Sequence, residues 1–308
     1  MNSPEFILHH YALSPFSQKV RSMLGHAGLP WRSAVTREFP PRPVLAQLAG
    51  GYRKVPVAQV GADIFCDSKI IAEEIAARSG QPALSLEAGG AAVQDYVRTV
   101  DLEIFLCCIM QARPLALLRN GRSGMSPLDG LRLIVDRIQI GRKSAVDRRR
   151  LKAPRQRVLD HLADAERRLQ AHDFLFGPAP GHADFSAYHA LWFMADRGGS
   201  PLVRPYPAVS GWMARMRAFG DGNRQEIDPK ETLAVASAAE PRPVPAEAAA
   251  DPLVGTPVAV APADYAQEPT RGTLAGVTPW RWIVAREVKG LGTLHVHFPR
   301  QGYEITGA

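Results

Sequence analysis

Ser14 is the first residue of the chain whose type and surroundings favour chemistry. It stands directly before Pro15, after a strand-like apolar run at residues 6–11. Serine is favoured at a helix N-cap and proline at the first helical position, so a helix is predicted to begin there. Unpaired backbone N–H groups and the positive end of the helix dipole gather at that point. An anion beside Ser14 would be stabilised, although the residue could also act only as a cap.

Two further motifs suit a peptide-like ligand. Val55-Pro56 opens a predicted strand, and a cis proline there would present the backbone of Val55 to a ligand. Asp67 and Ser68 stand just before an apolar helical run, where free backbone N–H groups also bind carboxylates. Taken singly, each motif is more typical of a strand start or of simple helix capping.

Neither the cysteines nor the histidines predict a metal site. The three cysteines, Cys66, Cys107 and Cys108, lack metal-ligand spacing and are too few for a disulfide framework. His295 and His297 share one face of a predicted strand, but no third ligand is evident. The low cysteine count and the lack of a secretory signal favour a reducing cytoplasm.

A small α/β layer in residues 1–83 would position the three motifs. Its strand-like and helix-like runs alternate and end with a hairpin and a closing helix, a pattern that favours a layered α/β fold. The predicted strands are residues 6–11, 55–60 and 64–66, and the predicted helices are residues 15–28 and 68–78.

Residues 88–230 are predicted to form an all-helical bundle, because their apolar residues recur at helical spacing. The run at 184–196 is apolar on several faces and is therefore predicted to be a core helix. The other predicted helices are residues 93–113, 128–149, 155–171 and 209–219.

The last part of the chain differs from both. Residues 231–252 are rich in proline and alanine, which predicts a linker. Residues 253–308 contain strand-like runs punctuated by glycine and proline, which predicts a small β-rich unit. A unit of this size would be marginal alone, so it is expected to pack on the rest of the protein.

The order and spacing of the motifs resemble the glutathione S-transferase superfamily over residues 5–220. Ser14-Pro15-Phe16 with Lys19-Val20-Arg21 is followed about 35 residues later by Lys54-Val55-Pro56-Val57, and then by Asp67-Ser68. Phe174-Leu175-Phe176-Gly177 and Ala183-Asp184 are similar to the entry of the core helix in the family's helical domain. The family usually places Ser or Thr where this chain has Gly181, so the usual capping box is expected to be lost.

The resemblance implies an α+β, multi-domain protein: a thioredoxin-like α/β domain, an all-helical domain and the additional β-rich unit. Val55 would pair with the cysteine backbone of glutathione beside a cis Pro56, and Asp67 with Ser68 would hold its γ-glutamyl end. Lys54 would lie near the glycyl end. The implied glutathione-binding residues are therefore Phe16, Lys54, Val55, Pro56, Asp67 and Ser68.

Ser14 matches the position at which the family places its sulfur-activating Tyr, Ser or Cys. Serine cannot form a mixed disulfide, so conjugation through an activated glutathione thiolate is expected, with glutathione as co-substrate and no metal. The second substrate would be an electrophilic, mostly apolar small molecule bound between the domains. Its expected pocket residues are Tyr11, Phe105, Cys108 and Met110, each of which is also a plausible core residue.

Two other functions stay open at this point. The same fold could carry glutathione or an apolar compound without turnover. Alternatively, the basic segment 132–157, which contributes to a net charge of +7, could bind a nucleic acid or an acidic partner. No aromatic residue interleaves that segment, so nucleic acid is not the expected partner. No membrane span is predicted, and a homodimer is implied by the resemblance alone.

Overall fold

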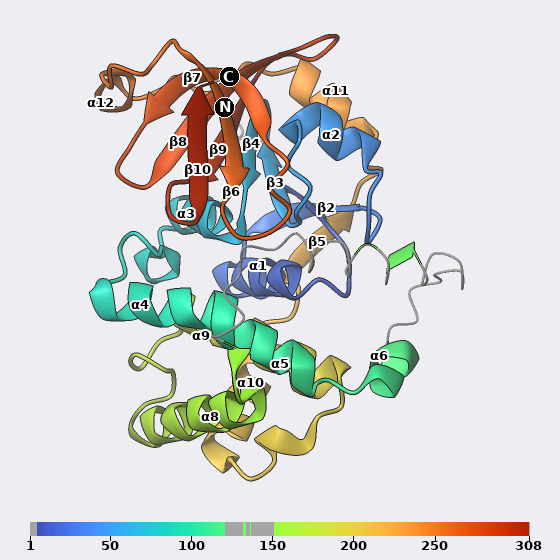
Figure 1. Ribbon diagram of the computed structural model, residues 1–308, viewed down its shortest axis with the longest axis vertical. Helices are drawn as coiled ribbons and strands as arrows, with labels where there is room; N and C mark the ends of the chain where they lie inside the picture. The colour runs from blue at the N-terminus through green and yellow to red at the C-terminus, as the bar shows by residue number, and fades with distance from the viewer. Residues whose placement is uncertain (1–4, 121–131, 134–135, 137–150, 308) are drawn as a thin grey trace.

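The computed structural model describes residues 5–120, 132–133, 136 and 151–307. A sheet with its covering helices forms one part, and a bundle of helices packs beneath it in the view of Figure 1. The C-terminal strands lie next to the N-terminal ones in the same part of the molecule, although more than 150 residues separate them in the sequence. This arrangement confirms the predicted fold class, including the additional β strands.

The strands form a single ten-stranded sheet in the order β10-β6-β7-β8-β9-β4-β3-β1-β2-β5. The N-terminal strands and their neighbour β5 make up one half, and the strands of the C-terminal unit make up the other. In chain order they are β1 (Ile7–His10), β2 (Pro30–Val35), β3 (Val57–Val60), β4 (Asp63–Cys66), β5 (Asn223–Glu226), β6 (Pro257–Pro262), β7 (Thr270–Val277), β8 (Arg281–Val288), β9 (Gly292–Pro299) and β10 (Tyr303–Gly307).

The helices comprise a group packed on the sheet, the bundle, and two short C-terminal helices. The first group is α1 (Pro15–Ala27), α2 (Pro43–Ala49) and α3 (Ser68–Ser79). The bundle contains α4 (Ala91–Thr99), α5 (Phe105–Gln111), α6 (Pro114–Asn120), α8 (Pro154–Ala171), α9 (His182–Leu191) and α10 (Pro207–Ala218), followed by α11 (Glu231–Ser237) and α12 (Ala246–Ala249). None of the helices in the described ranges is long and apolar enough to cross a membrane.

Sequence signals account for both ends of α1 and α3. Ser14 caps α1 through its hydroxyl, and Asp67 caps α3 through its carboxylate. Each helix ends at a glycine in the left-handed region, Gly28 with φ 67° and Gly80 with φ 67°. Glycine adopts this conformation without a steric penalty, so the chain can turn there.

Two π-helical segments interrupt the long helices expected at 93–113 and 184–196. The first, Val100–Ile104, joins α4 to α5, and the second, Trp192–Arg197, follows α9. Every residue of α9 is buried, as predicted for a core helix. The predicted helix at 128–149 lies almost wholly outside the described residues.

The C-terminal unit is continuous with the N-terminal sheet because β9 pairs in parallel with β4. A second hydrophobic core forms between them, with Ile64 and Cys66 of β4 packed among Val284, Val296 and Phe298. All five side chains are buried. The small β unit therefore gains its core by packing on the N-terminal domain, as its size required.

The segment 231–252, predicted as a linker, contains α11 and α12 and is anchored at Arg242. The Arg242 guanidinium binds Asp63 at 3.1 Å and Glu74 at 3.1 Å. His297 of β9 donates to the other oxygen of Asp63 at 2.8 Å, so one buried carboxylate holds two C-terminal segments. The Pro- and Ala-rich composition gave no sign of this anchorage.

A buried ion pair joins the sheet domain to the helical bundle. Lys19 of α1 is fully buried, and its Nζ lies 2.8 Å from Oδ2 of Asp101, which sits in the first π-helical segment. Burial alone would raise the pKa of Asp101, but the Lys19 charge lowers it to about 2. Both groups pay a desolvation cost, so their mutual attraction chiefly fixes how the two domains meet.

Replacing Lys19 with methionine should destabilise the protein by about 3–5 kcal/mol, because it leaves the Asp101 carboxylate buried without a counter-charge. The double variant Lys19→Met, Asp101→Leu should recover most of that loss. Urea unfolding at neutral pH measures both. A double variant as unstable as the single one would contradict this account of the pair.

Burial also controls the protonation of His9 in β1. Its Nε2 lies 3.2 Å from Oε1 of Gln59, and burial lowers its pKa to about 4, against the opposing effect of that hydrogen bond. Between about pH 6.5 and pH 4 the unfolded chain therefore binds a proton that the folded chain does not. Stability falls as the pH falls through this window.

The variant His9→Gln should weaken this pH dependence. At about 1.36 kcal/mol per pH unit, His9 accounts for about 2 kcal/mol of the stability lost between about pH 7 and pH 5. Urea unfolding at the two pH values should show a smaller loss in the variant by roughly that amount. Equal losses of stability in the two proteins would contradict this account, because they would mean that His9 has the same pKa in the folded and the unfolded chain.

Candidate functional site

The register of three strands brings the predicted motifs to one end of the sheet. Val57 of β3 lies opposite His9 of β1 on one side and opposite Cys66 of β4 on the other. Because β3 runs antiparallel to both neighbours, the segment before it meets the segments that follow them. Val55-Pro56, Ser14 and Asp67 therefore gather at the same edge.

Ser14 occupies the N-cap of α1 and is 3% exposed. Its Oγ accepts a hydrogen bond from the backbone N–H of Ser17 at 3.2 Å, which leaves its own proton available for an acceptor. Ser17 is fully buried, and its hydroxyl has no partner among the described residues. An acceptor placed beside Ser14 would also meet the positive end of α1.

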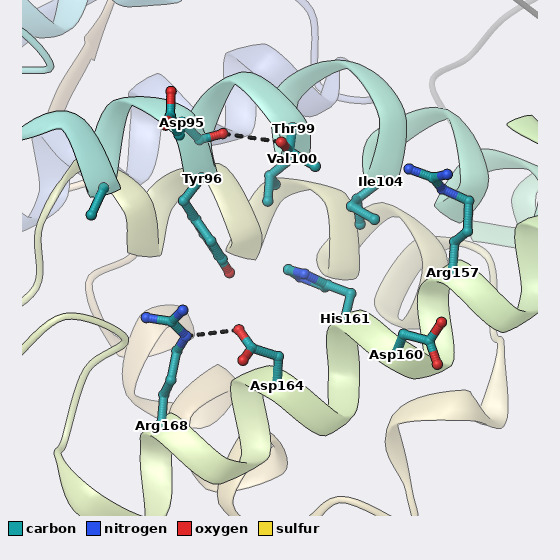
Figure 2. A pocket seen from close by; sticks show the side chains of 11 residues that line it. Asp95, Tyr96, Thr99, Val100, Ile104, Arg157, Asp160, His161, Asp164 and Arg168 are labelled. Atoms are coloured by element: carbon teal, nitrogen blue, oxygen red, sulfur yellow. Dashed lines mark hydrogen bonds and ion pairs between the residues drawn. The ribbon is translucent and has the colours of Figure 1, made fainter. Parts of the chain in front are cut away.

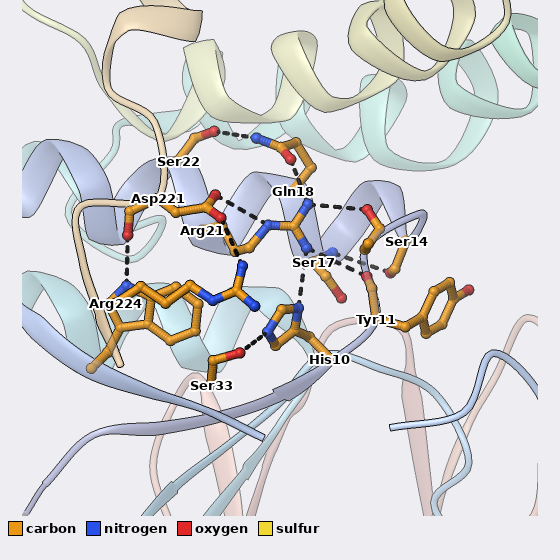
Figure 3. Close-up of polar contacts among 12 residues, drawn as sticks. His10, Tyr11, Ser14, Ser17, Gln18, Arg21, Ser22, Ser33, Asp221 and Arg224 are labelled. Atoms are coloured by element: carbon orange, nitrogen blue, oxygen red, sulfur yellow. Dashed lines mark hydrogen bonds and ion pairs between the residues drawn. The ribbon is translucent and has the colours of Figure 1, made fainter. Parts of the chain in front are cut away.

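The turn that carries Ser14 is held by the buried side chain of Arg21. Figure 3 shows the Arg21 guanidinium reaching back from α1 toward this turn, where it donates to the carbonyls of Tyr11 at 3.4 Å and Ala12 at 3.2 Å. Asp221 balances its charge at 3.3 Å. The sequence indicated Arg21 only as part of the motif. Its positioning role was missed, because the sequence alone does not distinguish a buried arginine on a helix from one exposed to solvent.

His10 completes this network in the neutral form. Its Nδ1 lies 3.1 Å from Nη1 of Arg21, and since guanidinium only donates, Nδ1 is the acceptor. Nε2 then carries the proton and donates to Oγ of Ser33 at 2.9 Å. Burial, followed by the charge of Arg21, lowers the pKa of His10 to about 3. The network thus fixes the end of β1 without adding a second charge.

The second motif contains a cis peptide bond between Val55 and Pro56. Pro56 is buried and Val55 is half-buried. Lys54, just before them, turns toward the C-terminal unit, where its Nζ lies 2.6 Å from Oδ1 of Asp264. The same Nζ stands 3.9 Å from the centre of the Tyr265 ring.

The third motif also contacts the C-terminal unit. Asp67 caps α3 by accepting from the N–H of Lys69 at 2.9 Å, and its φ of 90° is unusual for a residue with a side chain. Its other oxygen accepts from the hydroxyl of Tyr303 at 3.0 Å. Ser68, the first residue of α3, is 3% exposed. A non-glycine residue in this conformation is typical of a site whose surroundings hold it in place.

The residues expected to line a second-substrate pocket are not brought together. Phe105 and Cys108 are buried in the main hydrophobic core, where Phe105 packs against Phe16 with ring centres 4.9 Å apart. Burial raises the pKa of the Cys108 thiol well above its usual range. Tyr11 is half-buried and Met110 is exposed. Of these, Tyr11 lies closest along the chain to Ser14.

A pocket of about 520 Å³ lies elsewhere, between α4 and α8. Figure 2 shows Tyr96 from α4 and His161 from α8 directed into it, with Asp164 bound to Arg168 at one side. The pocket shares no residue with the three motifs. Within the described part of the chain, no group of three or more His, Cys, Asp or Glu residues could hold a metal ion.

Most of the basic segment 132–157 lies outside the described residues. Arg157, at its end, pairs with Glu103, so this charge is balanced within the helical domain.

At the entry of α9, the carboxylate of Asp184 accepts from the N–H of Gly181 at 3.0 Å and from Nε1 of Trp212 at 2.9 Å. The capping box was expected to be lost, but its aspartate half is kept, and only the hydroxyl that Gly181 cannot supply is missing.

Comparison with known proteins agrees with the fold described above. Residues 8–83 match the model of the glutathione S-transferase N-terminal domain, and residues 150–215 match that of the glutathione S-transferase C-terminal domain. None of the curated proteins matches the chain.

Among solved structures, the chain is similar to a GST-like protein from Pseudomonas syringae, at 32% identity and a TM-score of 0.79, with 98% of this chain and 100% of that chain covered. The chain also aligns with a glutathione S-transferase from Rhodospirillum rubrum F11, at 23% identity and a TM-score of 0.48, over 70% of this chain and 89% of that one. The similarity to the Pseudomonas protein spans all three parts of the chain, and the two domain matches coincide with the thioredoxin-like and helical parts. The chain therefore belongs to the glutathione S-transferase superfamily.

Proposed function

We propose that the protein is a glutathione transferase that joins the glutathione thiolate to an electrophilic, mostly apolar small molecule. One observation carries the proposal: the strand register gathers a helix N-cap serine, a Val-cis-Pro segment and an Asp-Ser helix cap at one edge of the sheet. In the reaction, the glutathione thiol releases its proton to water, and the thiolate sulfur forms a bond to the electrophilic carbon. In a substitution, the bond from that carbon to the leaving group breaks and the leaving group takes the electron pair; in an addition, the carbon–carbon π bond opens and the carbanion takes up a proton from water.

Each motif has a distinct role in this proposal. Ser14 donates a hydrogen bond from its hydroxyl to the glutathione thiolate, and Val55 pairs with the peptide backbone of glutathione. Asp67 receives the γ-glutamyl ammonium, and Ser68 with the free N–H groups of α3 receives the α-carboxylate. Phe16, packed between Phe105 and His189, fixes the first turn of α1.

The physical chemistry of the Ser14 environment is sufficient to activate a thiol. A free thiol has a pKa of about 8.5, and lowering it to about 6.5 requires roughly 2.7 kcal/mol. A hydrogen bond from a hydroxyl to a thiolate contributes about 1.5–3 kcal/mol, and a helix N-terminus adds about 0.3–1 kcal/mol. No general base is needed.

The electrophile is proposed to bind next to Ser14 on the side of Tyr11, between the two domains. A homodimer and a cytoplasmic location belong to the same proposal. The described cysteines support the second of these, because Cys66, Cys107 and Cys108 are all free.

A second function, glutathione or ligand binding without turnover, is favoured by one observation. Phe105 and Cys108, which were expected to line the pocket for the electrophile, are packed in the main hydrophobic core instead. Retention on immobilised glutathione is expected for both functions. Turnover of a generic aromatic electrophile with glutathione is expected only for the transferase.

The variant Ser14→Ala should raise the pKa of enzyme-bound glutathione by about 1–2 units and slow conjugation about 10- to 100-fold, because the thiolate loses one charge-assisted hydrogen bond. Ultraviolet titration of the bound thiolate and steady-state rates measure the two effects. Ser79→Ala is a control, since Ser79 lies at the far end of α3 and its hydroxyl donates to the carbonyl of Ile75, away from the Ser14 turn. If Ser14→Ala behaved like this control, Ser14 would not be the activating residue.

A further inference from the structure

The C-terminal unit places a carboxylate on Lys54, the residue that the family resemblance leads us to expect near the glycyl end of glutathione. Oδ1 of Asp264 lies 2.6 Å from Nζ of Lys54 and also accepts from the N–H of Tyr265 at 2.7 Å. The Tyr265 ring makes a cation–π contact with the same ammonium, with Nζ of Lys54 3.9 Å from the ring centre. The Lys54 charge is therefore already neutralised by the protein itself.

This contact is built into the fold, because the loop that carries Asp264 fits closely against the segment before Lys54. A Cβ on Gly51 would lie 2.1 Å from the carbonyl oxygen of Pro269, so only glycine allows this approach. Thr270 donates to the carbonyl of Ala49 at 2.6 Å. The loop is thus held at several points besides the ion pair.

The C-terminal unit also contacts the residue proposed for the glutamyl end, Asp67, but it brings a neutral hydroxyl there and no opposite charge. Tyr303 donates to Oδ2 of Asp67, and Tyr303 in turn lies 3.2 Å from the hydroxyl of Tyr52. An ionised carboxylate offers about four acceptor positions, so Asp67 keeps capacity for a ligand ammonium. The unit therefore changes the charge balance at one end of the site and preserves it at the other.

We propose that Asp264 stands in for the glycyl carboxylate at Lys54 and so sets the class of thiol that the site accepts; this rests on the proposed function. A free glycyl carboxylate would meet a paired lysine and the like charge of Asp264. The substrates favoured are γ-glutamylcysteinyl peptides whose C-terminal end is uncharged, and these bind at least as well as glutathione. Asp264 is thus a specificity-determining residue that lies outside the two domains typical of the family.

Calorimetric titration of the full chain with glutathione and with its glycyl monoethyl ester tests the proposal. The wild-type protein should bind the ester at least as tightly as glutathione, because the glycyl carboxylate of glutathione meets a Lys54 that is already paired with Asp264. The variant Asp264→Asn keeps an oxygen for the Tyr265 N–H and frees Lys54. It should bind glutathione about tenfold more tightly while its affinity for the ester stays unchanged.

Two results would overturn the proposal. One is a wild-type protein that binds glutathione about tenfold or more tightly than the ester. The control variant is Glu287→Gln, which removes a carboxylate that binds Thr293 within the same unit. The other result is an Asp264→Asn variant in which the ratio of the dissociation constants for glutathione and the ester equals that of this control. The double variant Asp264→Asn, Lys54→Met should lose the gain, and thermal melting confirms that each variant folds. If neither peptide bound any of these proteins, the proposed function itself would fail, which is a distinguishable result.

Discussion

The register at Val57 is the constraint on which the rest of the structure depends. With His9 on one side and Cys66 on the other, this residue aligns three strands so that their adjoining segments meet at one edge. A shift of one residue would turn each side chain to the opposite face and separate the three motifs. The proposed site is thus a consequence of backbone pairing in a buried sheet, and the side chains assigned to it come from the ends of rigid elements.

The same sheet explains why the C-terminal unit reaches the site. Since β9 runs parallel to β4, the chain leaving β9 emerges at the end of the sheet where Asp67 follows β4. Tyr303 then meets Asp67 within hydrogen-bonding distance. The buried carboxylate of Asp63 fixes this arrangement through His297 and Arg242, so the extension cannot be regarded as a detached appendage.

The sequence was informative where local chemistry sets the structure. Ser14-Pro15 and Asp67-Ser68 predicted two helix starts, and the apolar runs predicted β1, β3, β4 and the core helix α9. The resemblance then predicted the fold class and the family. These features depend on capping, periodicity and spacing within a few tens of residues.

Contacts between distant parts of the chain could not be predicted in the same way. Lys54 and Asp264 are 210 residues apart, and nothing in the composition near either one signals the pair. The burial of Arg21 and of Lys19 follows from domain packing, whereas charged residues on amphipathic helices are usually solvated. Phe105 and Cys108 show the converse, because apolar residues expected at a pocket are equally suited to a core.

The most direct test of the central claim is a crystal structure of the full chain with glutathione bound. The account predicts the sulfur within about 3.5 Å of Ser14 Oγ, the γ-glutamyl end at Asp67 and Ser68, and the peptide backbone along Val55. Glutathione bound instead in the pocket between α4 and α8, or at the sheet edge with its sulfur directed away from Ser14, would contradict it.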